Sequence, residues 1–459
     1  MTQVAAALVQ LAKDVELWQA DGQPMGTVGG QHLPLRGAEF QVWLLNAAQG
    51  RRPKLTPSLH AVSDAQEILA ARAMLCPTYP LWRRTGAWWG AGAPEVWVDC
   101  GGCAVQVTKE GWAVQKEAPL VRFLRPAGQL ALPTPIRQAG GRLGPLRHAL
   151  PFNSDDQWVL WLAWLVFALQ PTGAYPILSL TGPPHSGKST LAEVTKRLVD
   201  PNTMPLLYPP ADRRDLAAYV NSGWVIVLDN LTRVATWLSD ALCGMSTGIG
   251  FAARQLYSDA AMFRVGGYRP IVVTSVGGWA ARGDLQDRTL PLSFTPVEHS
   301  VAPDVVLRAV DAAHPAMLGW LLDTLAQSLG EAPVHTAHRF PWFLTVVRVV
   351  GERVGVDGLA AYEALREEQA GEVLSSSPIV SLLLRVVEAQ GVLEGTTADL
   401  LAKLTDEAGG VRNRWMSWPR TPEGLGRMLR TLPLGEAGLR VEARRTRHGT
   451  RLLVTKMEE

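Results

Sequence analysis

The 459-residue sequence is too long for one ordinary hydrophobic core and predicts roughly two to four domains. Its 47% hydrophobic and 19% charged residues exclude a largely disordered chain, and its net charge of +2 favours neither anionic nor cationic partners as a whole. Four cysteines, with a charged amphipathic stretch over residues 1–20 where a signal peptide would stand, predict a reduced cytoplasmic protein without structural disulfides.

Residues 1–124 are expected to form an α+β domain, followed by a linker over 125–150 that is rich in Pro, Gly and Arg. Helical patterns cover roughly 3–19, 37–49 and 58–75. The runs EVWVDC, CAVQVTK and GWAVQK then predict a small antiparallel meander. Cys100 and Cys103, in the sequence DCGGC, have the spacing of zinc ligands. A structural zinc site needs four ligands, so a hairpin turn is the favoured interpretation.

Residues 151–300 alternate strand-like and helical patterns, which predicts an α/β core with a parallel sheet, and residues 301–375 are mostly helical. The apolar run at 158–169, WVLWLAWLVFAL, is shorter than the roughly 18 residues that a membrane span needs. Its tryptophans recur at helical spacing, so the run predicts a buried helix and no membrane partner.

The segment YPILSLTGPPHSGKSTLAEVTKRLVD carries the strongest motif, a strand at 177–180 and a helix at 191–199 joined by G-x-x-x-x-G-K-[ST]. In such a loop, glycines let backbone N–H groups face phosphates, and the helix N-terminus adds partial positive charge. Lys188 would reach the β- and γ-phosphates of ATP, and the hydroxyl of Ser189 would ligate Mg²⁺. The residues expected to contact ATP are Gly182, Pro183, Pro184, His185, Ser186, Gly187, Lys188, Ser189 and Thr190.

Two further strand ends are expected beside this loop. The run WVIVL ends in Asp229, a second Mg²⁺ ligand, followed by Asn230 where many ATPases of this class carry a Glu that activates water. Asn can orient a water but cannot act as that base. The run PIVV ends in Thr274 and Ser275, and Thr274 is the candidate for contacting the γ-phosphate or the attacking water; an ordinary strand end is the alternative.

Arg288 lies at the start of the strand-like TLPLSF and is a candidate arginine finger that reaches the nucleotide of a neighbouring subunit. The alternative is an ion pair with Asp284 or Asp287, and Arg282 is the reserve candidate.

The order GPPHSGKST, VIVLDN, STGIGFAARQLYSD, RPIVVTS and GDLQDR resembles the AAA+ ATPase core of superfamily 3 and poxvirus-type primase-helicases. It is most similar to phage and mobile-element ATP-binding proteins that are often encoded beside a primase. The resemblance implies hexameric rings with ATP between subunits and DNA in the centre. It carries over the nucleotide and Mg²⁺ roles of Lys188, Ser189 and Asp229, and it implies that Arg288 is the arginine finger.

Two positions depart from that family. The third strand ends in Thr274 and Ser275 in place of the usual Asn. A basic residue usually occupies the tip of a DNA-tracking hairpin before this strand, whereas the tip here, residues 258–261, is SDAA. Arg254 and Arg264 flank the tip and are the candidates for DNA contact.

Residues 376–459 predict helices followed by two strands, as in a winged-helix domain. From residue 411 onward, eleven Lys or Arg face five Glu, a difference of +6, which suits phosphate contacts. A basic face that only packs against the ring is the alternative. The candidate DNA contacts are Arg427 and Arg430 on a helix and Arg444, Arg445, Arg447 and Arg451 on the wing.

These features bear on three functions. The first is an ATP-dependent, ring-forming DNA helicase or translocase of a phage or mobile element, acting on single-stranded or forked DNA, with a primase or primase-polymerase as a candidate partner. The second is a non-motor ATP-controlled DNA-binding or assembly factor that supports a primase, which Asn230 and the neutral hairpin tip favour. A small-molecule kinase is disfavoured because no lid or acceptor site is evident.

Overall fold

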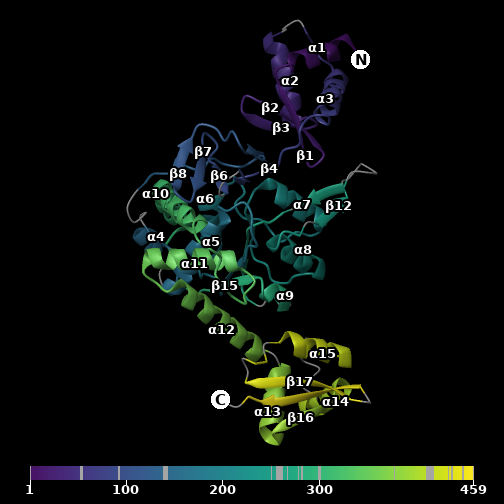
Figure 1. Ribbon diagram of the computed structural model, residues 1–459, viewed down its shortest axis with the longest axis vertical. Coiled ribbons are helices and arrows are strands. Elements are labelled where there is room, and N and C mark those ends of the chain that lie inside the picture. The colour runs from purple at the N-terminus through teal and green to yellow at the C-terminus, as the bar shows by residue number, and fades with distance from the viewer. Residues whose placement is uncertain are drawn as a thin grey trace. The chain divides into compact units, whose positions relative to one another are not determined.

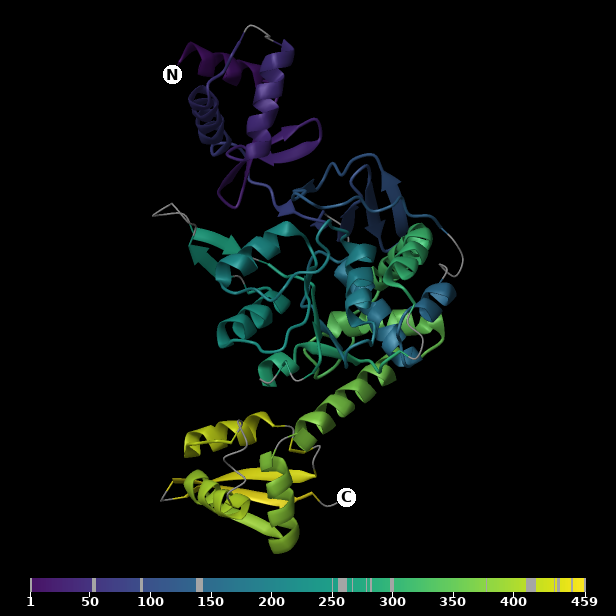
Figure 2. The ribbon, with the colours of Figure 1, turned by 180° about the vertical axis from the view of Figure 1, so that it is seen from behind.

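The computed structural model (Figures 1 and 2) is a mixed α/β protein whose chain forms two compact units. The first comprises Met1–Trp279 and Arg288–Val356, and the second comprises Ala280–Asp287 and Asp357–Glu459. The structure describes residues 2–51, 55–90, 94–137, 143–249, 251–254, 262–265, 267–277, 279–280, 283–297, 301–376, 378–409, 418–432, 434–435, 438–446 and 449–457.

The chain begins with helices and a small antiparallel sheet of order β1-β2-β3. The elements are α1 (Gln3–Leu11), β1 (Glu16–Ala20), β2 (Gln23–Val28), β3 (Gln31–Pro34), α2 (Ala38–Arg51) and α3 (Leu59–Ala73). The predicted helix over 3–19 is therefore wrong beyond Leu11. Its second half alternates buried and partly exposed side chains around Trp18, and the Asp21-Gly22 pair, with φ of 48° and 79°, makes the hairpin turn that joins β1 to β2.

The predicted meander is present, with one more strand than expected. The elements are β4 (Leu81–Trp82), β5 (Thr85–Trp88), β6 (Glu95–Asp99), β7 (Ala104–Thr108), β8 (Gly111–Gln115) and β9 (Arg122–Phe123). Strands β5-β6-β7-β8 pair antiparallel in chain order, and β4 pairs with β9 in parallel.

The centre of the first unit is a parallel sheet of order β11-β14-β10-β15. Its elements are α4 (Leu143–Ala149), α5 (Asp155–Ala168), β10 (Ile177–Thr181), α6 (Lys188–Val199), α7 (Arg213–Ser222), β11 (Ile226–Leu228), α8 (Thr236–Ser246), β12 (Phe251–Arg254), β13 (Met262–Val265), β14 (Ile271–Ser275) and β15 (Thr289–Ser293). Because these strands run parallel, the segments that follow β10, β11 and β14 meet at one edge of the sheet.

The apolar run at 158–169 lies in α5, where residues 158–168 are all buried, so the prediction of a buried helix is confirmed. Two helices complete the unit: α10 (Pro303–Leu329) and α11 (Pro341–Val354), which packs on α5. Among the described residues, one helix, α10, is long and apolar enough to cross a membrane, but 61% of its most apolar window is buried against the rest of the protein. A core helix passes this test equally well.

The second unit combines helices with an antiparallel sheet of order β16-β18-β17. Its elements are α9 (Gly283–Gln286), α12 (Gly358–Ser376), α13 (Pro378–Gln390), β16 (Val392–Thr396), α14 (Thr397–Ala408), α15 (Pro422–Thr431), β17 (Leu439–Thr446) and β18 (Gly449–Lys456). Three helices and the sheet share one core of leucine and valine side chains. The short strand β16, between two helices, was not predicted from the sequence.

Candidate functional site

The loop between β10 and α6 carries the predicted phosphate-binding motif. Gly182 opens it at φ 150°, and a side chain there would collide with the carbonyl oxygen of Phe294, so only glycine fits. Gly187 closes the loop at φ 77°, with a Cβ position that would press on the ring of Pro151. His185 also has a positive φ, 64°, which is uncommon for a residue with a side chain. The path of the loop is thus set by glycine at both ends.

Four predicted residues meet beyond the carboxyl ends of the strands. Ser189 Oγ donates a hydrogen bond to Asp229 Oδ1 at 2.9 Å, and Thr274 Oγ1 donates to the same oxygen at 2.6 Å. The Thr274 hydroxyl also accepts the backbone N–H of Asn230 at 2.8 Å. Thr274, which is only 2% exposed, therefore fixes both the carboxylate of Asp229 and the start of the next segment. Asn230 stands at φ 60°, a conformation that Asn tolerates better than most residues.

The ammonium of Lys188 is folded back over the loop. Its Nζ donates to the carbonyl oxygen of Pro183 at 2.6 Å and to Ser186 Oγ at 3.0 Å. Burial lowers the pKa of Lys188, and the negative charge of Asp229 raises it in part. Its two hydrogen-bond partners are neutral, so neither of them compensates the positive charge of Lys188. That charge can therefore attract an anion that enters the loop. Among the other loop residues, three are exposed: Pro183, Pro184 and His185. Ser186 is buried, and Thr190 lies in the first turn of α6.

The spacing of two oxygens in this site suits a hard divalent cation. Two ligands of an octahedral Mg²⁺, each at about 2.1 Å and at a right angle, lie about 3 Å apart. The oxygens of Ser189 and Asp229 are 2.9 Å apart. The pair therefore fits adjacent positions of such a coordination shell, with the remaining positions left for phosphate and water oxygens.

Arg288 lies at the opposite edge of the sheet. Its carbonyl oxygen accepts the N–H of Ile177 at 2.8 Å, at the point where β10 begins. The loop and Asp229 follow the other ends of these strands, so Arg288 is not brought together with them in one chain. Its role at a neighbouring subunit stays a prediction. Asp287, one of its alternative partners, pairs with Arg366 at 3.3 Å.

The predicted hairpin before β14 is present in the backbone, where β12 pairs with β13. Arg254 and Arg264 lie on these two strands, but their side chains, the tip at 258–261 and Arg282 lie outside the described residues. Figure 2 shows the hairpin beside α7, against which both strands pack.

The basic candidates in the second unit lie on α15 and the β17–β18 hairpin. Helix α15 turns Leu425 and Leu429 into the core and exposes Arg427 and Arg430. Arg444 and Arg451 are register partners with exposed side chains, Arg445 is next to Arg444 on β17, and Arg447 lies outside the described residues.

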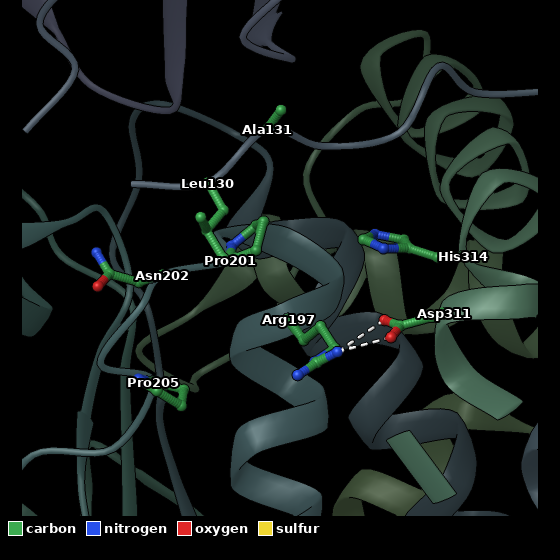
Figure 3. A pocket seen from close by; sticks show the side chains of 8 residues that line it. All are labelled: Leu130, Ala131, Arg197, Pro201, Asn202, Pro205, Asp311 and His314. Carbon is green, nitrogen blue, oxygen red and sulfur yellow. Dashed lines mark hydrogen bonds and ion pairs between the residues drawn. The ribbon is translucent and has the colours of Figure 1, made fainter. Parts of the chain in front are cut away.

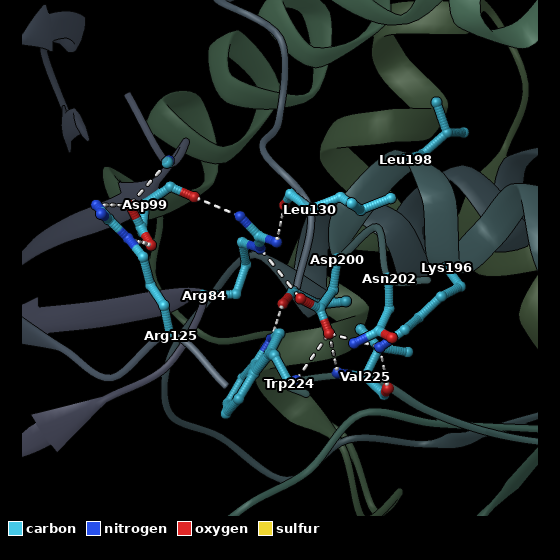
Figure 4. Close-up of polar contacts among 12 residues, drawn as sticks. Arg84, Asp99, Arg125, Leu130, Lys196, Leu198, Asp200, Asn202, Trp224 and Val225 are labelled. Carbon is cyan, nitrogen blue, oxygen red and sulfur yellow. Dashed lines mark hydrogen bonds and ion pairs between the residues drawn. The ribbon is translucent and has the colours of Figure 1, made fainter. Parts of the chain in front are cut away.

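A buried charge network at Asp200 was not predicted from the sequence (Figure 4). Both oxygens of this fully buried carboxylate are bonded: Oδ1 accepts from Arg84 Nε at 3.0 Å, and Oδ2 accepts from Lys196 Nζ at 2.6 Å. Oδ2 also accepts the N–H groups of Trp224 at 2.7 Å and Val225 at 3.0 Å. Burial alone would raise the pKa of Asp200, but the two cations lower it to about 2. Burial lowers the pKa of Lys196, and Asp200 opposes that shift.

The same network reaches the meander and the segment after it. Arg84 Nη1 donates to the carbonyl oxygen of Asp99 at 2.7 Å, and Nη2 donates to that of Leu130 at 2.6 Å. The carboxylate of Asp99 is held by both Nε and Nη2 of Arg125, at 2.8 and 2.7 Å. Since Lys196 lies on α6 and the chain continues from Val225 into β11, the network ties the meander to the two elements that carry the loop and Asp229.

A small pocket of about 190 Å³ lies beside the carboxyl end of α6, away from the loop (Figure 3). Its charged wall is the ion pair of Arg197 with Asp311, at 2.8 Å. Burial lowers the pKa of His314 to about 4, and its Nε2 bonds the carbonyl oxygen of Leu198. The lining residues are Leu130, Ala131, Arg197, Pro201, Asn202, Pro205, Asp311 and His314.

The cysteine pair occupies the turn between β6 and β7, as predicted. The N–H of Cys100 donates to the carbonyl oxygen of Cys103 at 2.9 Å, and both thiols are free. No group of three or more potential metal-ligating side chains occurs in the described part of the chain.

Two family models match the sequence. Residues 146–370 match the actinomycete integrative conjugative element replication protein, and residues 379–459 match the C-terminal domain of RepA from the same elements. No protein with a curated description matches.

Among solved structures, the chain is similar to the C-terminal region of NrS-1 in its A-form apo structure, with a TM-score of 0.43 and 10% identity over 99% of this chain and 98% of that chain. It is also similar to the SCCmec type IV Cch active helicase, with a TM-score of 0.49 and 12% identity over 96% of this chain and 93% of that chain. Because the two family models describe consecutive parts of one replication protein and together cover more than half of the sequence, the chain belongs to the family of actinomycete integrative conjugative element replication proteins.

Proposed function

We propose that this replication protein is an ATP-dependent, ring-forming DNA helicase or translocase with a P-loop AAA+ core of the superfamily 3 type. The observation that carries the proposal is the meeting of Ser189, Asp229 and Thr274 at the carboxyl edge of a parallel sheet, beside the loop that carries Lys188. A glycine-shaped loop in front of a helix N-terminus favours bound phosphate, and the two oxygens suit Mg²⁺.

In this proposal each side chain has a separate role. Lys188 would leave its neutral partners to bind the β- and γ-phosphates, and Ser189 and Asp229 would hold Mg²⁺, which would neutralise charge on the transferred phosphate. Thr274 keeps the carboxylate of Asp229 oriented, and Asn230 orients the attacking water. Arg288 of a neighbouring subunit stabilises charge at the γ-phosphate, since its place at the far edge of the sheet separates it from the loop of its own chain.

The second unit supports a DNA-binding role. Its order, α13–β16–α14–α15–β17–β18 with β18 central in the sheet, is that expected of a winged helix. We propose that α15 and the β17–β18 wing contact DNA phosphates. The proposed boundaries are an N-terminal domain at 1–124, a linker at 125–150, the ATPase core at 151–300, a helical region at 301–375 and the winged helix at 376–459.

A non-motor factor is the second candidate, and Asn230 is the observation that favours it. An amide cannot take a proton from water, so a site with Asn in this position suits ATP binding that controls assembly more than rapid turnover. In either case we propose a homo-oligomer, most simply a hexamer, that binds DNA and acts beside a primase in the cytoplasm.

Steady-state ATP hydrolysis with and without single-stranded DNA tests the proposal. The wild-type protein is expected to turn over ATP and to be stimulated by DNA. Lys188→Ala should lose roughly 100-fold or more, because one positioned electrostatic contact contributes about that much to such reactions. Lys109→Ala, which removes an exposed lysine on the meander, is the matched control. Turnover at the background level in assembled protein with DNA would leave only the non-motor candidate.

Mixed assemblies test Arg288. Arg288→Ala subunits retain a complete loop, and Asp229→Ala subunits retain the arginine, so mixing the two inactive proteins should restore part of the activity at interfaces that combine both intact groups. Native mass spectrometry must first establish that mixed assemblies form. If they form and stay inactive, Arg288 does not act between subunits.

A further inference from the structure

Two arginines, Arg83 and Arg269, contact residues that are three positions apart in the chain, Asn221 and Trp224, and neither forms an ion pair with a carboxylate in the described part of the chain. Arg83 follows β4, and its Nη1 and Nη2 donate to the backbone and side-chain oxygens of Asn221, at 3.3 and 2.6 Å. Arg269 lies over the ring of Trp224 at 5.3 Å. Its Nη1 donates to the carbonyl oxygen of Tyr268, and its Nε has no hydrogen-bond partner among the described residues.

The surroundings of the two arginines contain more positive than negative charge. Asp200 is the carboxylate that attracts both of them, and it is already bonded to Arg84 and Lys196. Four cations thus share one carboxylate. Burial and the charge of Arg83 lower the pKa of Arg269 to about 9, and burial lowers that of Arg83 to about 10. Each of the two residues is partly exposed, whereas the Nε atom of Arg269 is buried.

The pair lies at the sheet edge opposite the loop. Arg269 precedes β14 and Trp224 precedes β11, whereas Asp229 and Thr274 lie at the other ends of those strands. Asn221 is on α7, which packs against the β12–β13 hairpin, and Arg269 follows that hairpin. An anion held by the two arginines would therefore lie at the base of the hairpin and away from the nucleotide.

We propose that Arg83 and Arg269 together bind a phosphate of the DNA backbone at the base of the β12–β13 hairpin. The inference rests on the proposed DNA-binding function and adds a phosphate site that lies in neither the hairpin strands nor the winged helix. Guanidinium groups suit this ligand because their planar N–H forks match phosphate oxygens, and an anion between them would relieve the excess positive charge. No base-specific contact is involved, so binding at this site does not depend on sequence.

The test measures the affinity of the full chain for a fluorescein-labelled oligothymidine over a series of NaCl concentrations. For single strands, the slope of log K against log salt falls by about 0.7 for each phosphate that the protein no longer neutralises, so Arg83→Gln/Arg269→Gln, which removes one phosphate site, should lower it by about 0.7. Arg308→Gln, which removes an arginine already paired with Asp304, is the matched control and should leave the slope unchanged. Binding of a fluorescent ATP analogue should be equal in all three proteins.

Two further arms keep the result interpretable. Arg83→Lys/Arg269→Lys preserves both charges and should retain the wild-type slope, and Arg83→Gln alone serves if the double variant does not fold. Normal DNA binding with an unchanged slope in a folded double variant overturns the proposal. The proposal is also overturned if the double variant is no longer stabilised by inorganic phosphate but binds DNA with unchanged affinity. The two arginines would then bind a free anion and not the DNA backbone. Absence of DNA binding in the wild type would refute the DNA-binding function itself, together with this inference.

Discussion

Replacing Asp200 with Asn is the sharpest test of how the first unit is held together. Asn keeps the size of the side chain but leaves Arg84 and Lys196 buried without a negative partner, and it cannot accept all four hydrogen bonds that the carboxylate now accepts. Removing one partner from a buried ion pair costs about 3–5 kcal/mol, because the remaining charge stays desolvated. We therefore expect a loss of roughly 4 kcal/mol in the free energy of unfolding.

Thermal unfolding followed by calorimetry measures this loss. With about 2 °C per kcal/mol for a large folded unit, Asp200→Asn should lower the midpoint of the first unit by about 8 °C. The control is Asp311→Asn, since Asp311 is paired with Arg197 but is 53% exposed, and such surface pairs contribute about 1 kcal/mol or less. If Asp200→Asn does not fold, Lys196→Met removes one cation and leaves Arg84 to pair with Asp200. Equal midpoints for Asp200→Asn and Asp311→Asn would refute the reasoning.

Three other predictions follow from the site. Thr274→Val removes the hydroxyl that orients Asp229, so ATP turnover should fall roughly 10-fold or more while binding of a fluorescent ATP analogue persists; equal turnover would contradict the assigned role. Gly182→Ala places a side chain against the carbonyl oxygen of Phe294 and should abolish nucleotide binding, whereas Gly50→Ala, at an open position on α2, should not. The pKa of Asp200, about 2 against an ordinary 3.8, means that its stabilisation is complete above about pH 4 and is lost as the pH falls towards 2. The urea concentration at the midpoint of unfolding should therefore fall over that pH range in the wild type. The part of this fall that comes from protonation of Asp200 should be absent in Asp200→Asn.

The sequence predicted the parts of this fold in which local chemistry is decisive. The loop from Gly182 to Ser189 needs glycine at fixed positions. Because an apolar strand precedes it and a helix follows it, the motif can be recognised from the sequence alone. The ends of β11 and β14 can also be predicted from the sequence, because each strand is a buried apolar run that ends at a polar residue. The direct contact of Thr274 with Asp229 required the order of the strands, which places β14 between β10 and β11.

Other features depend on contacts between segments far apart in the chain. Lys196 and Asp200 are four residues apart and resemble an ordinary surface pair, since nothing local indicates that both are buried. Arg84, more than a hundred residues earlier, completes the network only in the fold. The error at 3–19 was different. The Asp21-Gly22 pair is a strong hairpin signal, and the helical periodicity of the first eleven residues does not continue up to it.

The bond between Arg84 and Asp200 also bears on how the protein can be divided for study. The stretch that the first family model matches begins at residue 146, which suggests a convenient place to start a shorter protein. Such a protein would lack Arg84 and the carbonyl oxygen of Leu130. It would also expose Asp200 and Lys196, at the end of the helix that starts with Lys188, to water. A fragment intended for nucleotide-binding measurements should therefore begin before β4, so that the meander accompanies the sheet it completes.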